Sequence, residues 1–378
     1  MYSRLLTVPT KNSFFLFGPR GVGKTTWVKT NFPKAIYLDL LDSKIFNPLF
    51  ANPARIEEKI PENFTDWVVI DEVQRIPDLL NEVHRLIENR HIKFVLTGSS
   101  ARKLRRGGIN LLGGRAAIYQ MHPLTAVELG EGFNLTDCLK YGSLPSVFEQ
   151  SNKEDYLAGY IGAYIQQEVV AEGISRNLSA FARFLETASF SQGSVLNMSE
   201  VAREASVGRR MAEDYFCALE DLLVGVRIPV FSKKAKRKLV SHSKFYFFDT
   251  GVYQAIRPVG PFDEPKMIGG IALEGLFMQN LRAINDYLKF GYDLFYYRTV
   301  AGVEVDFVIY GKNGLKAFEI KSKNDIFSKD LVGLKTFKED YPIAKCYLLY
   351  GGKQKMYKQG VEIWPIKEAL LNLPKILG

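Results

Sequence analysis

The sequence of 378 residues contains little cysteine and no long hydrophobic run. Its three cysteines, Cys138, Cys217 and Cys346, lie far apart, so they match neither a disulfide framework nor a zinc site. Sparse, scattered cysteine is typical of the reducing cytoplasm. No segment approaches the roughly 18 consecutive apolar residues of a membrane span, and the N-terminus lacks the pattern of a secretory signal. We therefore expect a cytoplasmic protein that spans no membrane.

Apolar and basic residues are plentiful. Hydrophobic residues make up 47% of the chain, which is enough for real cores. The length suggests two or three domains. Lysine and arginine exceed aspartate and glutamate by 50 to 41, so the formal net charge is +9. This excess favours a polyanionic partner, and we expect DNA.

The segment GPRGVGKT at residues 18–25 fits the phosphate-loop pattern G-x-x-x-x-G-K-[ST]. An apolar run at 14–17 predicts a strand before it, and residues 25–30 predict a helix after it. Glycines let backbone N–H groups surround phosphates, Lys24 reaches the β- and γ-phosphates, and the Thr25 hydroxyl ligates Mg2+. A chance glycine-rich turn is disfavoured by the strand–loop–helix context. The predicted ATP-binding residues are Gly18, Pro19, Arg20, Gly21, Val22, Gly23, Lys24, Thr25 and Thr26.

An acid pair follows the apolar run WVVI at residues 67–70. Alone, Asp71 and Glu72 are equally typical of a helix start, because acids suit the first turn. Together with the loop they favour a nucleotide hydrolase site, in which Asp71 holds the Mg2+ shell and Glu72 orients and activates water. Ligands in open parallel sheets gather at this carboxyl end of the strands.

Further candidates contact the phosphates in this hypothesis. A strand predicted at 93–97 ends near Thr97 and Ser99, either of which could sense the γ-phosphate; the alternative is a serine-rich turn. Arg115 is a candidate arginine finger, and Arg20 is a second cation near the phosphates. Most isolated arginines are only solvated surface, so that alternative stays open for both.

Periodicity divides the chain into four predicted domains. Short apolar strands alternate with helical patterns up to about residue 130, which indicates a parallel α/β sheet. Its predicted strands are 14–17, 35–38, 68–70, 94–96 and 116–121, and its predicted helices are 25–30 and 79–88. We predict an ATPase core (1–135), a helical lid or linker (136–195), a winged helix-like domain (196–255) and a nuclease-like domain (256–378).

The third predicted domain has the pattern of a helix-turn-helix followed by a hairpin. A short amphipathic helix from 199 and a turn at 206–208 precede a helical apolar stripe at 212–223. Arg209 and Arg210 would open the recognition helix, where phosphates and base edges can be reached. A basic run at 233–238 would form a wing tip on phosphates. The alternative is a packing module with a solvated charge run.

The fourth predicted domain contains an antiparallel hairpin at residues 303–321. If Tyr310 pairs with Leu315, Asp306 lies opposite Glu319 and Glu304 lies opposite Lys321. Period two then puts these four on one face. The opposite face would carry Val305, Phe307, Ile309, Phe318 and Ile320. Facing carboxylates repel each other, so a shared divalent cation such as Mg2+ would stabilise the pair.

This acid followed by Glu-x-Lys resembles nucleases of the restriction-endonuclease-like superfamily. The resemblance implies that Asp306 and Glu319 bind the metal and that Lys321 stabilises developing charge or orients water. It also implies a further glutamate from a preceding helix, and Glu274 is the candidate. The alternatives are an ordinary hairpin with a solvated polar face and a degenerate, inactive nuclease fold. A bulge in the hairpin would shift its register and void the geometric argument.

Taken together, the chain resembles a prokaryotic AAA-type ATPase family whose C-terminal region was labelled a domain of unknown function. The resemblance is carried by GPRGVGKTT at 18–26, WVVIDEVQRIPDLL at 67–80, FVLTGSSARKL at 94–104, KFYFFDTGVY at 244–253 and the VEVDFVI…FEIKS hairpin. It implies an ATPase core, a winged helix and a nuclease-like terminal domain, and self-association into rings.

The main functional hypothesis is an Mg2+-dependent ATPase whose nucleotide state controls a DNA-directed C-terminal half. The rival is a regulatory switch that holds ATP and recruits a partner, with an inactive nuclease-like domain. A small-molecule kinase fits less well, because the acid pair suits water activation and the basic run at 233–238 would have no role.

Overall fold

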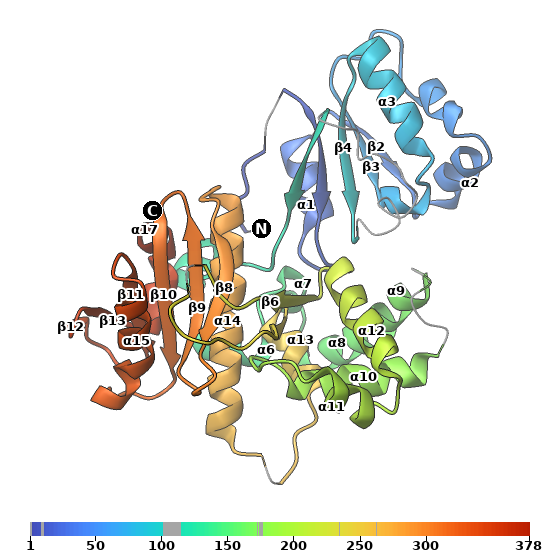
Figure 1. The fold of residues 1–378 in the computed structure, drawn as a ribbon. Helices are drawn as coiled ribbons and strands as arrows, with labels where there is room; N and C mark the ends of the chain where they lie inside the picture. The colour runs from blue at the N-terminus through green and yellow to red at the C-terminus, as the bar shows by residue number, and fades with distance from the viewer. Residues whose placement is uncertain are drawn as a thin grey trace. The chain divides into compact units, whose positions relative to one another are not determined.

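The chain divides into two compact units. The N-terminal unit comprises residues 6–122 and 221–223, and the C-terminal unit comprises residues 1–5, 123–220 and 224–378. The computed structural model (Figure 1) describes residues 2–8, 11–100, 115–171, 173, 177–233, 235–261 and 263–378.

The N-terminal unit is built on one sheet of five parallel strands in the order β2-β3-β4-β1-β5. Its strands are β1 (Ser13–Phe17), β2 (Ile36–Asp39), β3 (Trp67–Asp71), β4 (Lys93–Gly98) and β5 (Ala116–Gln120). Each lies within two residues of its predicted range, so the predicted parallel sheet is confirmed. Strand β4 lies between β1, which precedes the phosphate loop, and β3, which ends at the acid pair.

Helices cover both faces of this sheet. They are α1 (Lys24–Asn31), α2 (Ser43–Ala51) and α3 (Leu79–Arg90), with 3-10 turns at Pro53–Lys59 and Val73–Arg75. One face packs against α2 and α3 through a core that includes Leu49, Val83 and Leu86. On the other face, Phe32 at the end of α1 contacts Trp67 and Phe14. The predicted helices at 25–30 and 79–88 are confirmed, whereas α2 was not predicted.

The first half of the C-terminal unit is helical, as predicted for residues 136–195. Its helices are α5 (Ala126–Leu129), α6 (Leu135–Tyr141), α7 (Pro145–Phe148), α8 (Lys153–Gly159), a π-helical segment (Tyr160–Ile165), α9 (Gln166–Ala171) and α10 (Leu178–Phe190). Helices α11 (Met198–Glu204) and α12 (Arg209–Asp221) and the antiparallel pair β6 (Gly225–Ile228) and β7 (Lys244–Phe247) come next.

The second half of this unit is a six-stranded sheet in the order β12-β13-β11-β10-β9-β8. Its strands are β8 (Asp293–Arg298), β9 (Glu304–Gly311), β10 (Gly314–Lys321), β11 (Lys345–Tyr350), β12 (Met356–Lys358) and β13 (Val361–Pro365). Its helices are α13 (Thr250–Ile256), α14 (Pro265–Tyr287), α15 (Val332–Asp340), α16 (Ile366–Leu371) and α17 (Leu373–Leu377). Helices α14, α16 and α17 pack on one face and α15 on the other.

A single core joins the three segments that we predicted as separate domains from residue 136 onward. Phe277 and Leu281 of α14 share it with Cys138 of α6 and with Ile228 and Tyr246 of the β6–β7 pair. These segments therefore form one compact unit. None of the described helices is both long and apolar enough to cross a bilayer.

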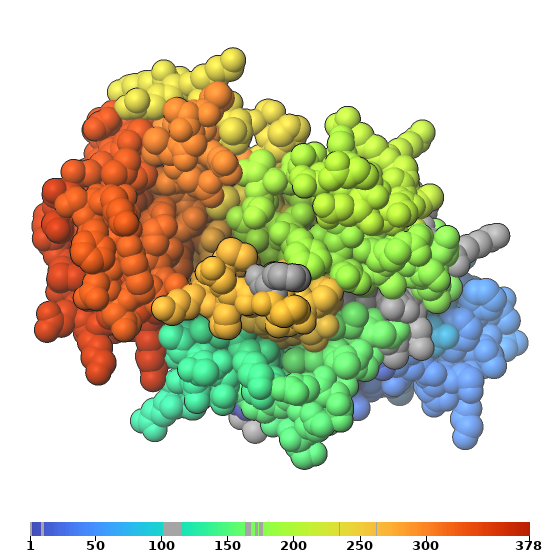
Figure 2. Space-filling model, turned by 90° about the horizontal axis from the view of Figure 1, so that it is seen from below, coloured from blue at the N-terminus to red at the C-terminus, as the bar shows by residue number. Residues whose placement is uncertain are grey.

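The basic run does not form an isolated wing tip in the described residues. Between β6 and β7 the chain lies along β8, where Phe231 N–H donates to Tyr296 O at 2.7 Å and Leu239 bridges to Thr299. Arg237 forms ion pairs with Glu339 and Asp340, each at 3.0 Å. Figure 2 shows this yellow segment against the orange C-terminal part. These contacts hold the described part of the run on the unit, whereas residue 234 lies outside the described residues. A wing tip that contacts phosphates stays a prediction.

The β9–β10 hairpin has the predicted register from Tyr310–Leu315 to Phe307–Phe318. Beyond that point, β9 carries a bulge, because Phe295 and Tyr297 of β8 pair with Val308 and Val305. The bulge turns Val305 onto the α15 face, so its predicted place beside Phe307 is wrong.

Candidate functional site

The phosphate loop connects β1 to α1 in the way that the sequence predicts. Gly21 and Gly23 have φ values of 81° and 90°, a region that favours glycine. Lys24 begins α1 and its side chain is buried, with 7% of its surface exposed. Its Nζ donates to the carbonyl oxygens of Gly18 (2.6 Å) and Pro19 (3.1 Å). The ammonium therefore lies inside the loop that would surround the phosphates.

The magnesium-binding pair of the prediction is brought together. Thr25 Oγ1 donates to Asp71 Oδ2 at 3.0 Å, although the two residues are 46 positions apart. Tyr37 OH also donates to Oδ2, and Thr97 Oγ1 donates to Oδ1. Thr97 reaches Asp71 because β4 lies between β1 and β3. Sequence reasoning missed Tyr37, whose only signal is its place near the end of a predicted strand.

Glu72 has a left-handed backbone, with φ 59°. Such a conformation costs a non-glycine residue about 1–3 kcal/mol and recurs at functional sites. Gln74 Nε2 donates to Glu72 and also to Ser99 Oγ at 3.0 Å. The predicted water-activating acid and the predicted sensor Ser99 are thus linked through Gln74, which the sequence analysis missed.

Of the two candidate arginines, Arg20 lies in the phosphate loop and Arg115 lies away from it. Arg20 is exposed within the loop. Arg115 forms an ion pair with Glu88 of α3 and precedes β5, whose Ala116 pairs with Ser13 at the start of β1. Because the phosphate loop follows the other end of β1, Arg115 does not reach the loop of its own chain. A role of Arg115 as a finger toward another copy stays a prediction.

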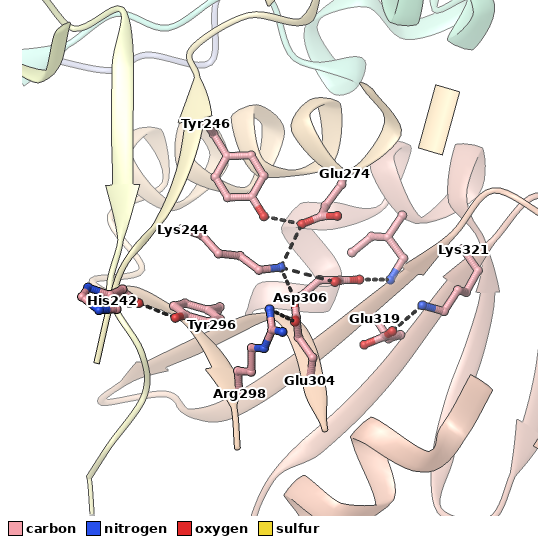
Figure 3. Close-up of polar contacts among 11 residues, drawn as sticks. His242, Lys244, Tyr246, Glu274, Tyr296, Arg298, Glu304, Asp306, Glu319 and Lys321 are labelled. Atoms are coloured by element: carbon pink, nitrogen blue, oxygen red, sulfur yellow. Dashed lines mark hydrogen bonds and ion pairs between the residues drawn. The ribbon is translucent and has the colours of Figure 1, made fainter. Parts of the chain in front are cut away.

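The C-terminal unit contains a buried ion cluster around a lysine that the sequence analysis missed (Figure 3). Lys244 Nζ lies 2.5 Å from Glu304 Oε1, 3.3 Å from Glu274 Oε1 and 3.7 Å from Asp306 Oδ1. Tyr246 OH donates to Glu274. The only sequence signal of Lys244 is its position as a charged residue directly before the apolar run FYFF.

The remaining predicted residues of this site lie beside the cluster. Lys321 Nζ pairs with Glu319 Oε1 at 2.5 Å, whereas Glu304 pairs with Lys244 and Arg298. The predicted Glu304–Lys321 pairing is therefore wrong. The cause is the end of the regular β9–β10 ladder at Phe307, beyond which the bulge begins.

The predicted metal ligands do not form a metal-binding group here. Among the residues that the structure describes, no three or more histidine, cysteine, aspartate or glutamate side chains are arranged to hold a metal ion. Glu274 and Asp306 share the Lys244 ammonium instead, and Asp306 Oδ2 accepts from Ile320 N–H at 2.8 Å. The second divalent cation that we predicted at Glu274, Asp306 and Glu319 is not supported by this arrangement.

Burial shifts the acids of this cluster toward protonation. Burial, together with the nearby charge of Asp306, raises the pKa of Glu274 to about 7 and that of Glu319 to about 8. Burial opposes the charge of Lys321, but Glu319 and Asp306 raise its pKa overall. Within the described residues, no group donates to the buried Oε2 of Glu319.

These shifts predict that the protein becomes less stable as the pH rises toward 8. The folded pKa of Glu319, about 8, exceeds the unfolded value of roughly 4.3, so the folded state binds more protons between these values and stability falls with rising pH. We expect the melting temperature of the wild type to fall between pH 6 and pH 8.5, and that of Glu319→Gln to fall less. Equal slopes in differential scanning fluorimetry would contradict the assignment.

Three family models match successive parts of the chain. A model described as an AAA domain matches residues 10–130. Two different models of domains of unknown function match residues 133–263 and 269–369. An uncharacterised protein of Mycobacterium tuberculosis is 26% identical over 95% of this chain and 79% of its own. One from Haemophilus influenzae is 22% identical over 62% of each chain.

Likenesses to solved structures are weak. The ORC1 protein of Aeropyrum pernix in complex with DNA matches with 15% identity and a TM-score of 0.26, covering 66% of this chain and 87% of that one. A protein from Vibrio cholerae matches with 12% identity and a TM-score of 0.25, covering 91% of this chain and 97% of that one. The AAA model coincides with the phosphate loop, the acid pair and the parallel sheet, so residues 10–130 carry an AAA-type P-loop domain.

Proposed function

We propose that the chain binds ATP with Mg2+ in its N-terminal unit and hydrolyses it. The observation that carries the proposal is the 3.0 Å hydrogen bond between Thr25 Oγ1 and Asp71 Oδ2, next to the buried ammonium of Lys24. Hydroxyl and carboxylate oxygens are the ligands that Mg2+ prefers, so the residues fit the ion. Bound Mg2+ would neutralise charge on the β- and γ-phosphates.

The remaining residues of the site have separate roles in this proposal. Lys24 and the loop N–H groups hold the phosphates, and Thr25 and Asp71 hold the metal shell. Glu72 accepts a proton from the attacking water, and Thr97 or Ser99 contacts the γ-phosphate side of the site. Arg20 adds positive charge at the loop. Self-association stays a prediction, on which any role of Arg115 toward a second copy depends.

For the C-terminal unit, two observations favour the rival hypothesis of an ATP-dependent regulatory protein with an inactive nuclease-like domain. The cluster acids are occupied by Lys244, and Arg237 of the basic run is paired within the unit. A DNA contact is supported by the net charge of +9 and by the exposed Arg209 and Arg210 at the start of α12. The winged-helix assignment rests on α11, α12 and the β6–β7 pair.

One assay tests both halves of the proposal. Purified protein is incubated with ATP, Mg2+ or Mn2+ and single-stranded, double-stranded or branched DNA, and both phosphate release and strand scission are scored. We expect Mg2+-dependent phosphate release that DNA increases, and no scission. Absence of phosphate release under every condition would contradict the ATPase. Scission that disappears in both Asp306→Ala and Lys321→Ala would instead establish the nuclease hypothesis.

A further inference from the structure

The ammonium of Lys244 lies beside Glu274 and Asp306, two of the acids that the resemblance to metal-dependent nucleases predicts as metal ligands. Lys244 is the first residue of β7, and its side chain is 1% exposed. Two of the carboxylates around it, Glu304 and Asp306, come from β9, and the third, Glu274, comes from α14. Figure 3 shows the ammonium pointing into the space between these acids.

The three carboxylates around Lys244 also receive other donors from the chain itself. Arg298 pairs with the second oxygen of Glu304 at 3.2 Å, and Ile320 N–H donates to the second oxygen of Asp306 at 2.8 Å. Tyr246 OH donates to Glu274. A buried ammonium persists only when it is paired and hydrogen-bonded. Burial opposes the charge of Lys244, yet its neighbours raise its pKa well above the usual lysine value.

A divalent cation would compete with this ammonium for the same oxygens. Mg2+ requires oxygen ligands at about 2.0–2.1 Å in near-octahedral geometry. Glu274 Oε1 and Asp306 Oδ1, which would have to supply such ligands, both face Lys244 Nζ. A lysine and a divalent cation cannot share this position, because their like charges would repel at contact distance.

We propose that Lys244 is a resident counter-ion that excludes divalent cations from the acidic cluster and fastens the β6–β7 pair to the C-terminal sheet. The cluster joins β7, α14 and β9, and β7 also continues into the helical part, since Val195 bridges to Lys244 and Gln192 to Phe245. In this proposal, the acidic cluster that resembles a nuclease site has a structural role: its ion pairs with Lys244 connect the helix-turn-helix segment to the sheet.

Mn2+ binding to the full-length chain tests the proposal. The experiment uses nucleotide-free protein with Thr25→Ala and Asp71→Asn, so that the N-terminal site contributes no metal binding and a failure of the proposed ATPase does not affect the result. Bound Mn2+ is followed by electron paramagnetic resonance. We expect no Asp306-dependent binding up to millimolar Mn2+ with Lys244 present, and at least tenfold tighter binding in Lys244→Met that Asp306→Asn removes.

Lys316→Met is the matched control, because Lys316 is also buried, lies in β10 of the same sheet and donates to Leu377 O outside the cluster. It should gain no Mn2+ site. Asp306-dependent Mn2+ binding with Lys244 in place would overturn the proposal, and this result does not depend on any Lys244 variant folding. A folded Lys244→Met or Lys244→Gln that gains no Mn2+ site would overturn it as well.

Discussion

Replacing Lys24 by alanine should weaken ATP binding by at least about 100-fold, which corresponds to about 2.7 kcal/mol. The Lys24 ammonium is buried and held by the Gly18 and Pro19 carbonyls, so it lies inside the phosphate loop. Charge-assisted hydrogen bonds to phosphate oxygens are about twice as strong as neutral ones, and the loop N–H groups that remain carry only partial charge. Isothermal titration with a non-hydrolysable ATP analogue and Mg2+ measures the loss.

Lys34→Ala is the matched control for this variant. Lys34 is exposed and follows α1, so its removal changes the net charge equally without touching the loop. Its affinity for the analogue should equal that of the wild type. If Lys24→Ala and Lys34→Ala bind the analogue alike, the phosphate loop is not the nucleotide site. A thermal melt of each variant separates lost binding from lost folding.

The N-terminal site could be predicted from sequence because its chemistry is local to strand ends. The phosphate loop specifies its own backbone through glycine, and the acid pair follows an apolar strand of a parallel sheet. In such a sheet the carboxyl ends of the strands lie at one edge, so Thr25 and Asp71 were expected at the same edge. Tyr37 and Gln74 could not be predicted as partners of the acids, because a side chain's hydrogen-bond partner depends on β-strand order and rotamer rather than on any local pattern.

The C-terminal cluster could be predicted only in part, because one extra residue in β9, the bulge, changes which side chains share a face of the sheet. The hairpin register followed from the turn, but the bulge at residues 306–307 reverses the side-chain alternation that the prediction assumed. Lys244 comes from a strand about 60 positions earlier and looks like an ordinary charged residue before an apolar run. Helix α2 escaped prediction because Pro48 lies inside it, where proline normally ends a helix.

Replacing Glu72 by glutamine should lower kcat for ATP hydrolysis by about 100- to 10,000-fold while ATP affinity stays close to that of the wild type. Glutamine has nearly the same size as glutamate but cannot accept a proton from water. The strained backbone of Glu72, with φ 59°, places its carboxylate beside Gln74 and Ser99 at the carboxyl end of the sheet. Single-turnover phosphate release, measured alongside analogue binding, separates the catalytic step from affinity.

The matched control is Glu58→Gln, which makes the same chemical change at an exposed position in the same unit. It should leave both kcat and affinity unchanged. A Glu72→Gln variant that hydrolyses ATP at the wild-type rate would show that another group activates the water. If affinity falls together with kcat, the carboxylate supports the nucleotide site through Gln74 rather than activating the water, and Gln74→Ala should then reproduce the loss. If only kcat falls, the carboxylate acts on the attacking water and not on ATP binding.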